Sequence, residues 1–323
     1  MKTNITSTNF NSCVITVDEN ESGRRIDNFL HSQLKSIPKT LIYKLLRNRK
    51  IRVNKKRVNH TYKLALKDEV YVPKLMYPDQ PNIRFSISKQ QINLLINAIL
   101  YNDDYILAIN KPSGIAVHGG SGLKFSIIDI LRTLLPNLSF LELVHRLDRE
   151  TSGILLFAKK KSVLRLLHEQ FRSNQVKKYY CALVCGRWPS KRKIIQVPLK
   201  KNIIHSGAHI VRVNIEGKIS KTIFTIKEYF YNNQATLLKV NPITGRTHQI
   251  RVHAQYAGHP IALDKLYGDS NFNHQIAQTG LNRLFLHASS MIFIHPIFKK
   301  TICLTAPLSQ ELTKSLSQLR CLN

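Results

Sequence analysis

Residues 145–157 read His-Arg-Leu-Asp-Arg-Glu-Thr-Ser-Gly-Ile-Leu-Leu-Phe, so a charged segment runs directly into an apolar one. The uninterrupted apolar run predicts a buried strand. Asp148 would lie at the mouth of that strand, between Arg146 and Arg149, and nearby guanidinium groups favour the ionised form of a carboxyl group. An ionised, positioned aspartate can act as a nucleophile or as a base. The residues alone leave open a plainer alternative, in which Asp148 only caps a turn and both arginines are solvated.

A second charged segment, residues 244–253, reads Thr-Gly-Arg-Thr-His-Gln-Ile-Arg-Val-His. Its first two residues predict a turn, and the apolar residues that follow at helical spacing predict a helix that ends near Gly258. His248 and Arg251 would share roughly one face, which suits a phosphate or a fixed carboxylate. His248 and His253 lack the spacing and the intervening glutamate of a metal-binding helix, so no zinc site is predicted. A helix that tracks nucleic acid without catalysis is the alternative.

A third segment, residues 178–188, reads Lys-Tyr-Tyr-Cys-Ala-Leu-Val-Cys-Gly-Arg-Trp, and its alternation predicts a strand. Tyr180 could stack on a base and offer its hydroxyl for proton transfer. Alternatively, it packs in the core with its hydroxyl satisfied. Cys181 and Cys185 fit the strand as small apolar residues and not as metal ligands.

A fourth segment, residues 109–120, reads Ile-Asn-Lys-Pro-Ser-Gly-Ile-Ala-Val-His-Gly-Gly and is rich in turn-forming residues. Its glycines could let the backbone approach a phosphate. It has neither the Gly-x-Gly-x-x-Gly pattern nor the lysine pattern of a phosphate-binding loop, so no nucleotide cofactor is predicted.

The N-terminal part of the chain is predicted to be a separate basic module. Apolar residues at helical spacing over 26–34 and 41–46 predict two helices, and a period of two over 51–72 predicts a small hairpin sheet. Seven of the eleven residues from 47 to 57 are basic and none is acidic. A solvated face usually interleaves acids, so we expect a phosphate-contacting surface made of Arg47, Arg49, Lys50, Arg52, Lys55, Lys56 and Arg57.

The composition agrees with a nucleic-acid partner. The 323 residues include 49 Lys and Arg but only 19 Asp and Glu, a formal charge of +30. Such an excess favours a polyanionic partner, although a solvated basic surface or an AT-rich genome would also produce it. A hydrophobic content of 43% excludes a disordered basic tail, and the length suggests about two domains. Five cysteines without a Cys-x-x-Cys pair, and no long apolar run or signal peptide, predict a cytoplasmic protein without membrane spans.

Together, the four segments resemble those of the RluA-like family of RNA pseudouridine synthases and occur in the same order. Residues 22–75 are similar to the S4-type RNA-binding domain, and residues 25–30 with 52–57 look most like RluC-type members of the family. The resemblance spans about residues 14–310. It implies an α+β protein in which a small domain of two helices and a hairpin precedes a mixed, largely antiparallel sheet with flanking helices. The expected parts are an N-terminal tail or strand (1–21), the RNA-binding domain (22–84), a linker (85–99) and the catalytic domain (100–323).

The resemblance also implies an activity, the isomerisation of specific uridines of 23S ribosomal RNA to pseudouridine. Asp148 matches the catalytic aspartate, Tyr180 the active-site tyrosine and Arg251 the basic residue that pairs with the aspartate. Arg146 matches the arginine that takes the place of the flipped uridine. The remaining substrate-binding residues would be His145, Arg246, His248 and Ile250.

This reaction breaks the N1–C1′ bond, turns the base and joins C5 to C1′, without a change in oxidation state. We therefore expect no cofactor and no metal. The sequence leaves open whether Asp148 attacks C1′ or takes a sugar proton, which uridines are modified, and whether the substrate is free 23S RNA or a pre-50S particle. A monomer is expected because the charge disfavours self-association. The competing hypotheses are a non-catalytic ribosomal RNA-binding assembly factor and an enzyme that acts on transfer RNA or on different ribosomal uridines.

Overall fold

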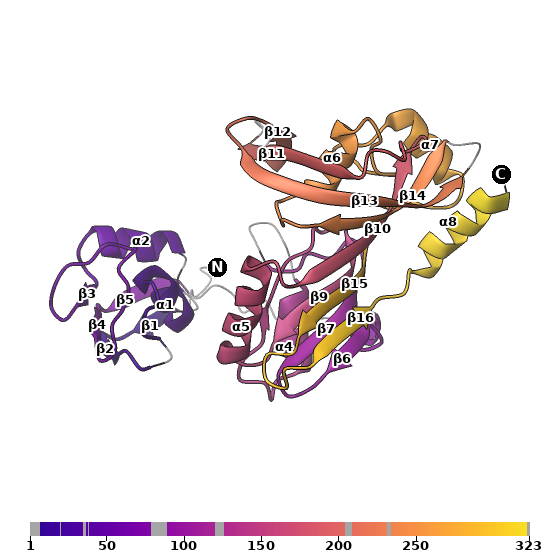
Figure 1. Ribbon diagram of the computed structural model, residues 1–323. Helices are drawn as coiled ribbons and strands as arrows, with labels where there is room; N and C mark the ends of the chain where they lie inside the picture. Colours follow the sequence, from indigo (N-terminus) through magenta and orange to yellow (C-terminus); the bar gives the residue numbers. More distant parts are fainter. Residues whose placement is uncertain are drawn as a thin grey trace, which may run out of the picture. The chain divides into compact units, whose positions relative to one another are not determined.

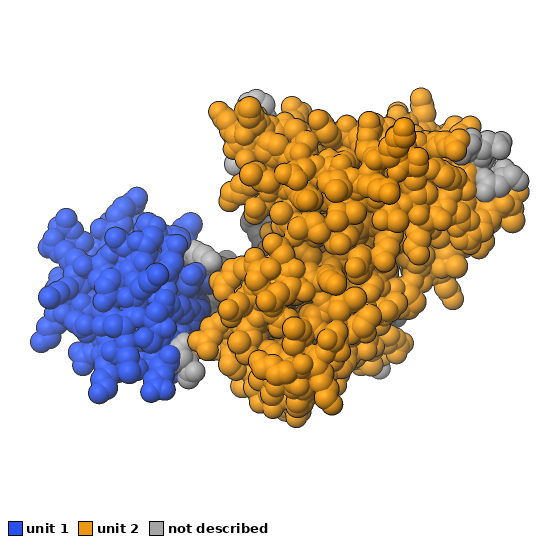
Figure 2. Space-filling view, viewed as in Figure 1, with its two compact units in different colours: residues 1–85 blue, residues 86–323 orange. Residues whose placement is uncertain are grey.

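The computed structural model describes residues 7–19, 21–34, 37, 39–78, 89–119, 126–203, 209–230 and 234–321. The chain divides into two compact units, residues 1–85 and 86–323 (Figures 1 and 2). Residues 1–6, 20 and 85–88 of the predicted tail and linker lie outside the described residues. The rest of the tail contributes two strands to unit 1, and the rest of the linker contains helix α3 (Lys89–Ile96) of unit 2.

Unit 1 contains the two predicted helices, α1 (Ile26–Gln33) and α2 (Lys39–Arg47). The unit also contains a three-stranded antiparallel sheet in the order β2 (Cys13–Thr16), β4 (Glu69–Val72) and β3 (Arg52–Val53), and β1 (Ser7–Phe10) pairs with β5 (Leu75–Pro78). Phe29 and Leu30 of α1 pack with Val70 of β4 in one core. This core closes because alternate residues of β4 point inward, as the period-two pattern predicts.

Unit 2 is built on one sheet of eleven strands in its described part (Figure 1). The main path runs β12-β11-β13-β14-β10-β15-β9-β7-β6, while β16 pairs with β15 and β8 with β9. Every pairing is antiparallel except that of β15 with β9, so the predicted mixed, largely antiparallel sheet is confirmed. The strands are β6 (Ile99–Asn102), β7 (Ile106–Lys111), β8 (Glu142–Leu143), β9 (Ser152–Ala158), β10 (Lys177–Cys185), β11 (Ile194–Ile203), β12 (His209–Val213), β13 (Lys218–Phe230), β14 (Ala235–Pro242), β15 (Leu286–Ile294) and β16 (Thr301–Thr305).

Helices cover both faces of this sheet. Helix α4 (Ile127–Leu134) shares one core with β7 and β9, and α5 (Lys161–Arg172) packs on the opposite face of the same strands. Helix α6 (Gln249–Tyr256) packs on β10, β13 and β14, whose other face meets α7 (Ser270–Ala277) and α8 (Gln310–Cys321). Strand β9 is buried along its whole length, which explains its uninterrupted apolar run.

Gly153 lies where the charged segment of residues 145–153 enters β9. It pairs with Ala288 in the parallel contact to β15 and has a φ of 109°. A Cβ atom at this position would lie 2.3 Å from the Ala288 carbonyl oxygen, so only glycine fits. The close crossing fixes the start of β9 and therefore the segment that carries Asp148.

None of the helices in the described ranges combines the length and the apolar character needed to cross a membrane.

Candidate active site

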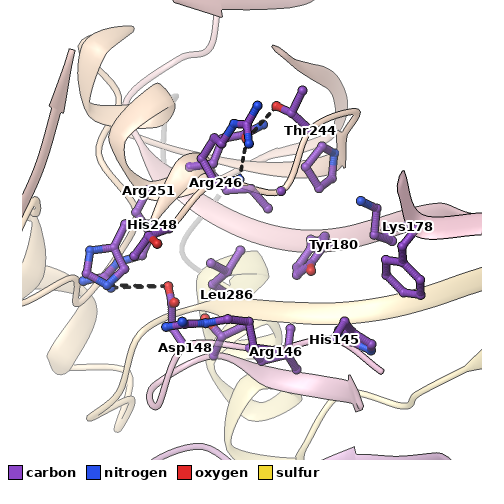
Figure 3. A pocket seen from close by; sticks show the side chains of 18 residues that line it. His145, Arg146, Asp148, Lys178, Tyr180, Thr244, Arg246, His248, Arg251 and Leu286 are labelled. Carbon is purple, nitrogen blue, oxygen red and sulfur yellow. Dashed lines mark hydrogen bonds and ion pairs between the residues drawn. The ribbon is translucent and has the colours of Figure 1, made fainter. Parts of the chain in front are cut away.

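One pocket in unit 2 lies between the segment before β9, strand β10 and the loop that leads into α6 (Figure 3). It is lined by all eight residues predicted for catalysis and substrate binding: His145, Arg146, Asp148, Tyr180, Arg246, His248, Ile250 and Arg251. They come from three segments that are far apart in the sequence.

Asp148 faces the side chains of Arg251 and His248 in this pocket. Its Oδ2 lies 3.6 Å from Arg251 Nη1 and 3.9 Å from His248 Nε2, and 20% of its side chain is exposed. Figure 3 shows these groups converging at one end of the pocket. A carboxylate in this position lies beside Arg251 and His248 and is still open to the pocket, so it can contact a substrate atom.

Arg251 is held by a carboxylate that the sequence analysis did not find. Its Nε and Nη2 both donate to Asp264, at 2.7 Å each, and the Asp264 side chain is fully buried. Burial disfavours the charged guanidinium, but its bonds to Asp264 and the nearby Asp148 together raise the pKa of Arg251 above its usual value. The fork therefore stays charged and fixed, with Nη1 directed at Asp148.

His248 does not lie on the face of the predicted helix. Helix α6 begins at Gln249, and His248 precedes it in the left-handed conformation, with a φ of 53°. Its Nδ1 lies 2.8 Å from the Tyr267 hydroxyl, which accepts a hydrogen bond from the Val211 amide. If that hydroxyl donates to Nδ1, the ring proton lies on Nε2, which faces Asp148. Burial, opposed by Asp148, lowers the pKa of His248.

Gln249 fixes the loop on the other side of His248. Its Oε1 accepts from the Thr244 hydroxyl at 2.7 Å and from the Arg246 amide at 3.0 Å, while Nε2 donates to the Lys221 carbonyl and to the Thr222 hydroxyl. This buried amide therefore ties residues 244–246 to β13. The sequence analysis missed it because a glutamine beside a histidine carries no pattern of its own.

Tyr180 lies on β10 in the middle of the pocket, beside Leu286 of the neighbouring strand (Figure 3). Burial, together with the negative charge of Asp148, raises the pKa of its hydroxyl. The side chain is therefore a neutral phenol at neutral pH that offers an aromatic face and a hydrogen-bond donor.

Arg146 and Arg246 are both exposed at the rim. Arg246 Nε donates to the Ile219 carbonyl at 3.3 Å. The Arg146 side chain makes no hydrogen bond or ion pair with any residue that the structure describes. A long cationic side chain without a partner can move to a ligand at little cost.

His145 lines the pocket, but its ring is engaged by the protein. Its Nε2 accepts from the Leu156 amide at 3.2 Å, and the ring stacks on Phe171 with centroids 5.2 Å apart. Burial, helped by the charge of Lys178, lowers the pKa of His145 to about 3. The ring is therefore neutral, and its contacts favour a supporting role for this predicted substrate-binding residue.

The turn-rich segment at the end of β7 is hydrogen-bonded to the segment that carries Asp148. The Lys111 ammonium is buried and donates to the carbonyl oxygens of Arg149, Pro112 and Ile115 at 2.8–3.0 Å. Burial lowers the pKa of Lys111 to about 7, although the negative charges of Glu150 and Asp148 favour the charged form. Ser113 also donates to the Glu150 carbonyl at 2.6 Å. Within the described residues of this segment, the contacts found are structural; Gly120 lies outside them.

A second buried network lies behind the first residue of β9. Arg283 Nη1 donates to the Ser152 hydroxyl at 3.1 Å, and that hydroxyl lies 2.9 Å from His287 Nδ1. His287 Nε2 lies 3.1 Å from the Ala306 carbonyl, which can only accept, so Nε2 carries the proton and Ser152 donates to Nδ1. Burial lowers the pKa of His287 to about 4, so this ring is neutral. The sequence analysis missed this network as well.

No group of three or more His, Cys, Asp or Glu side chains within the described ranges is arranged to hold a metal ion.

The seven basic residues predicted to contact RNA are all exposed in unit 1, at the end of α2 and around β3. Five of them, together with Tyr71, line a concave surface: Arg49, Lys50, Arg52, Lys55 and Arg57. Arg47 lines a neighbouring hollow with Tyr43 and His60. Exposed cations beside aromatic rings suit both the phosphates and the bases of a nucleic acid.

Comparisons with known proteins identify the family of this chain. A family model described as RNA pseudouridylate synthase matches residues 105–256, and an S4 domain model matches residues 24–70. Ribosomal large subunit pseudouridine synthase C of Pasteurella multocida is 53% identical over 307 residues, covering 95% of this chain and 94% of that protein. The protein of the same name from Escherichia coli (strain K12) is 52% identical over 309 residues, covering 95% and 96%.

A solved structure, human RNA pseudouridylate synthase domain containing 4, aligns with a TM-score of 0.57 at 28% identity, covering 71% of this chain and 95% of that one. Its fold is therefore shared with unit 2, and the S4 match accounts for unit 1. The resemblance seen in the sequence is confirmed: the chain belongs to the family of RNA pseudouridylate synthases.

Proposed function

We propose that this protein converts specific uridines of 23S ribosomal RNA to pseudouridine, with Asp148 as the catalytic group. The substrate is supported by the names of relatives that are more than half identical over almost the whole chain. The observation that carries the catalytic assignment is the pocket in which Asp148 lies 3.6 Å from a buried, fixed Arg251.

Asp148 must be ionised in either of the two mechanisms, attack on C1′ or removal of a sugar proton. Asp264 binds the Arg251 guanidinium through Nε and Nη2, which leaves Nη1 to contact the Asp148 carboxylate at 3.6 Å. His248 Nε2 lies 3.9 Å from the same carboxylate oxygen. Arg251 is a positioning and charge-stabilising residue in this scheme.

The uridine must leave the base stack before Asp148 can reach its sugar. Arg146 is suited to fill the vacated place, since it is exposed at the rim of the pocket and makes no bond with the described residues that would hold it back. A planar guanidinium can both stack on the neighbouring bases and donate hydrogen bonds to the unpaired partner.

Tyr180 would pack against the uracil ring. Its raised pKa keeps the phenol protonated, so it orients the base and relays a proton and does not act as a phenolate base. The proton that leaves C5 therefore needs another acceptor, for which the Asp148 carboxylate in the same pocket is available once C1′ has been released.

We assign RNA capture to residues 1–85 and catalysis to residues 86–323. The exposed basic residues of unit 1 support the first role, and their separation from the pocket residues in the sequence supports the division. The enzyme would act as a cytoplasmic monomer, on free 23S RNA or on a pre-50S particle.

The test is replacement of Asp148 by asparagine, which keeps the shape of the side chain and removes its charge. Tritium release from 23S RNA labelled at uridine C5 should fall below detection, a loss of more than about 10⁴-fold, while RNA affinity in a filter-binding assay stays within about twofold. Turnover by the variant would overturn the role of Asp148. Tight binding by the wild type without tritium release would favour a non-catalytic assembly factor instead.

A further inference from the structure

Lys178 lines the active-site pocket, but no role has been given to it above. It lies on β10, two residues before Tyr180, and its side chain is half-buried. Figure 3 shows Lys178 and Asp148 at opposite ends of the pocket, with Tyr180 between them. A ligand that touches Asp148 and lies along Tyr180 therefore extends toward Lys178.

Among the described residues, the Lys178 ammonium has no polar partner. Its Nζ lies 5.8 Å from the centroid of the Phe171 ring, and no hydrogen bond or ion pair from the described residues reaches it. Burial lowers its pKa. Partial removal of an ammonium from water costs free energy unless another group replaces the lost hydrogen bonds. The N–H groups of the Lys178 ammonium can therefore be satisfied by a ligand in the pocket that supplies a hydrogen-bond acceptor.

The shape of uridine identifies that acceptor. With C1′ against Asp148, the ring atom farthest from C1′ is C4, so O4 lies at the Lys178 end of the pocket. Isomerisation turns the base by a half turn about the line through N3 and C6, which exchanges N1 with C5 and O4 with O2. A carbonyl oxygen is therefore present at the same place before and after the turn.

We propose that Lys178 donates a hydrogen bond to this far carbonyl oxygen of the flipped uracil, O4 in the substrate and O2 in the product. This inference rests on the proposed function and adds a recognition group for the base. An ammonium suits the task because its three donors rotate freely and can follow the exchange of one oxygen for the other.

The same contact stabilises the detached base. When the N1–C1′ bond breaks, the base takes the bonding electron pair, and the negative charge spreads over N1, O2 and O4. The base later gains a proton at N1 and loses the one at C5. The negative charge of the base is therefore present only after the N1–C1′ bond breaks and before the C5–C1′ bond forms. A cation in a pocket shielded from water stabilises that state more than the neutral uridine, and so speeds the reaction. This holds whichever way Asp148 acts.

The test compares Lys178→Met, which keeps the length of the side chain, with Lys178→Arg, which keeps a cationic donor. Lys177→Met is the matched control, since Lys177 is the preceding residue of β10, is exposed and does not line the pocket. Single-turnover tritium release at saturating enzyme measures the chemical step, and filter binding at three salt concentrations measures affinity and its salt dependence.

We expect Lys178→Met to slow the chemical step by about 100-fold, with RNA affinity within about twofold and an unchanged salt slope. Lys178→Arg should recover about a tenth of the wild-type rate, and Lys177→Met should retain the wild-type rate. Thermal melting checks that each variant is folded, and if Lys178→Met is not, the same comparison is made with Lys178→Gln.

Two results would overturn the inference. An unchanged chemical step in Lys178→Met would show that Lys178 does not act on the base. Weaker binding with a salt slope reduced by about 1 and an unchanged chemical step would show that it contacts a phosphate instead. Absence of tritium release by the wild type is a different result, because it contradicts the proposed function itself.

Discussion

The seven basic residues between positions 47 and 57 of unit 1 are all exposed, whereas Lys111, Arg251 and Arg283 of unit 2 are largely buried and hydrogen-bonded. None of the seven forms an ion pair with another residue in the described part of the chain, while Arg251 and Arg283 are each held by a carboxylate. The first group can contact the phosphates of a flexible polyanion in more than one position. The second group fixes the positions of the buried groups that it binds, so breaking one of its contacts should reduce the free energy of unfolding far more.

The largest expected effect comes from Asp264→Asn. The asparagine oxygen can still accept from the Leu266 and Tyr267 amides, but its NH₂ group would face the Arg251 Nε–H and leave a buried guanidinium without its counter-charge. Breaking a buried pair costs about 3–5 kcal/mol, so urea unfolding should show a loss of that size. Tritium release should fall as well, because Arg251 would no longer be held beside Asp148.

The control for this variant is Glu228→Gln, which breaks a two-bond pair with Arg320 on the surface of unit 2. About a third of the Glu228 side chain and half of that of Arg320 are exposed, so the cost should be under about 1 kcal/mol. Equal losses of unfolding free energy in the two variants would contradict the distinction between buried, hydrogen-bonded cations and exposed ones.

Acid should destabilise unit 2 through histidines that are buried in the neutral form. Burial lowers the pKa of His287 to about 4 and that of His253 to about 4, below the value of about 6.5 in an unfolded chain. The unfolded chain therefore binds more protons between these values, so the stability that each contributes is complete above about pH 6.5 and is lost as the pH falls toward 4. For His287 the loss is on the order of 3 kcal/mol.

Urea unfolding at steps between pH 7 and pH 4 measures this effect. His287→Asn should flatten the pH dependence, at a lower stability near neutral pH because Ser152 loses its acceptor. The exposed His274 is the control, and His274→Asn should leave the slope unchanged. An unchanged slope in His287→Asn would mean that this ring is not what couples the fold of unit 2 to pH.

The sequence was sufficient for the fold and for eight of the residues that line the pocket. The helices and strands follow from local hydrophobic patterns, whereas the site residues follow from the resemblance to the family. The apolar run after residue 153 predicts a buried strand, and β9 is buried throughout. Three of the lining segments were recognised by their order and composition. Partners that meet only through tertiary structure could not be predicted. Arg251 and Asp264 are 13 residues apart, and Ser152 and His287 are 135 apart, with no pattern that connects them.

Lys178 illustrates a limit of another kind. It stands in a segment that the sequence analysis examined, yet strand alternation only assigns it to the same side as Tyr180. That it faces the pocket without a polar partner among the described residues, with Phe171 beneath it, depends on where α5 ends and on how the strand is placed in the sheet. Electrostatic environment is a property of the folded chain, so one sequence cannot reveal which cation lacks a partner.

The smallest expected effects belong to unit 1. Lys55→Ala and Lys56→Ala, on the turn after β3, should each weaken binding of 23S RNA only severalfold and reduce the salt slope of the affinity by about 1, because each removes one phosphate contact. Lys63→Ala, an exposed lysine of unit 1 outside residues 47–57, is the matched control and should change the slope less. A slower chemical step with an unchanged salt slope would mean that these lysines do not contact phosphates. Unit 1 would then contribute to catalysis and not only to RNA binding.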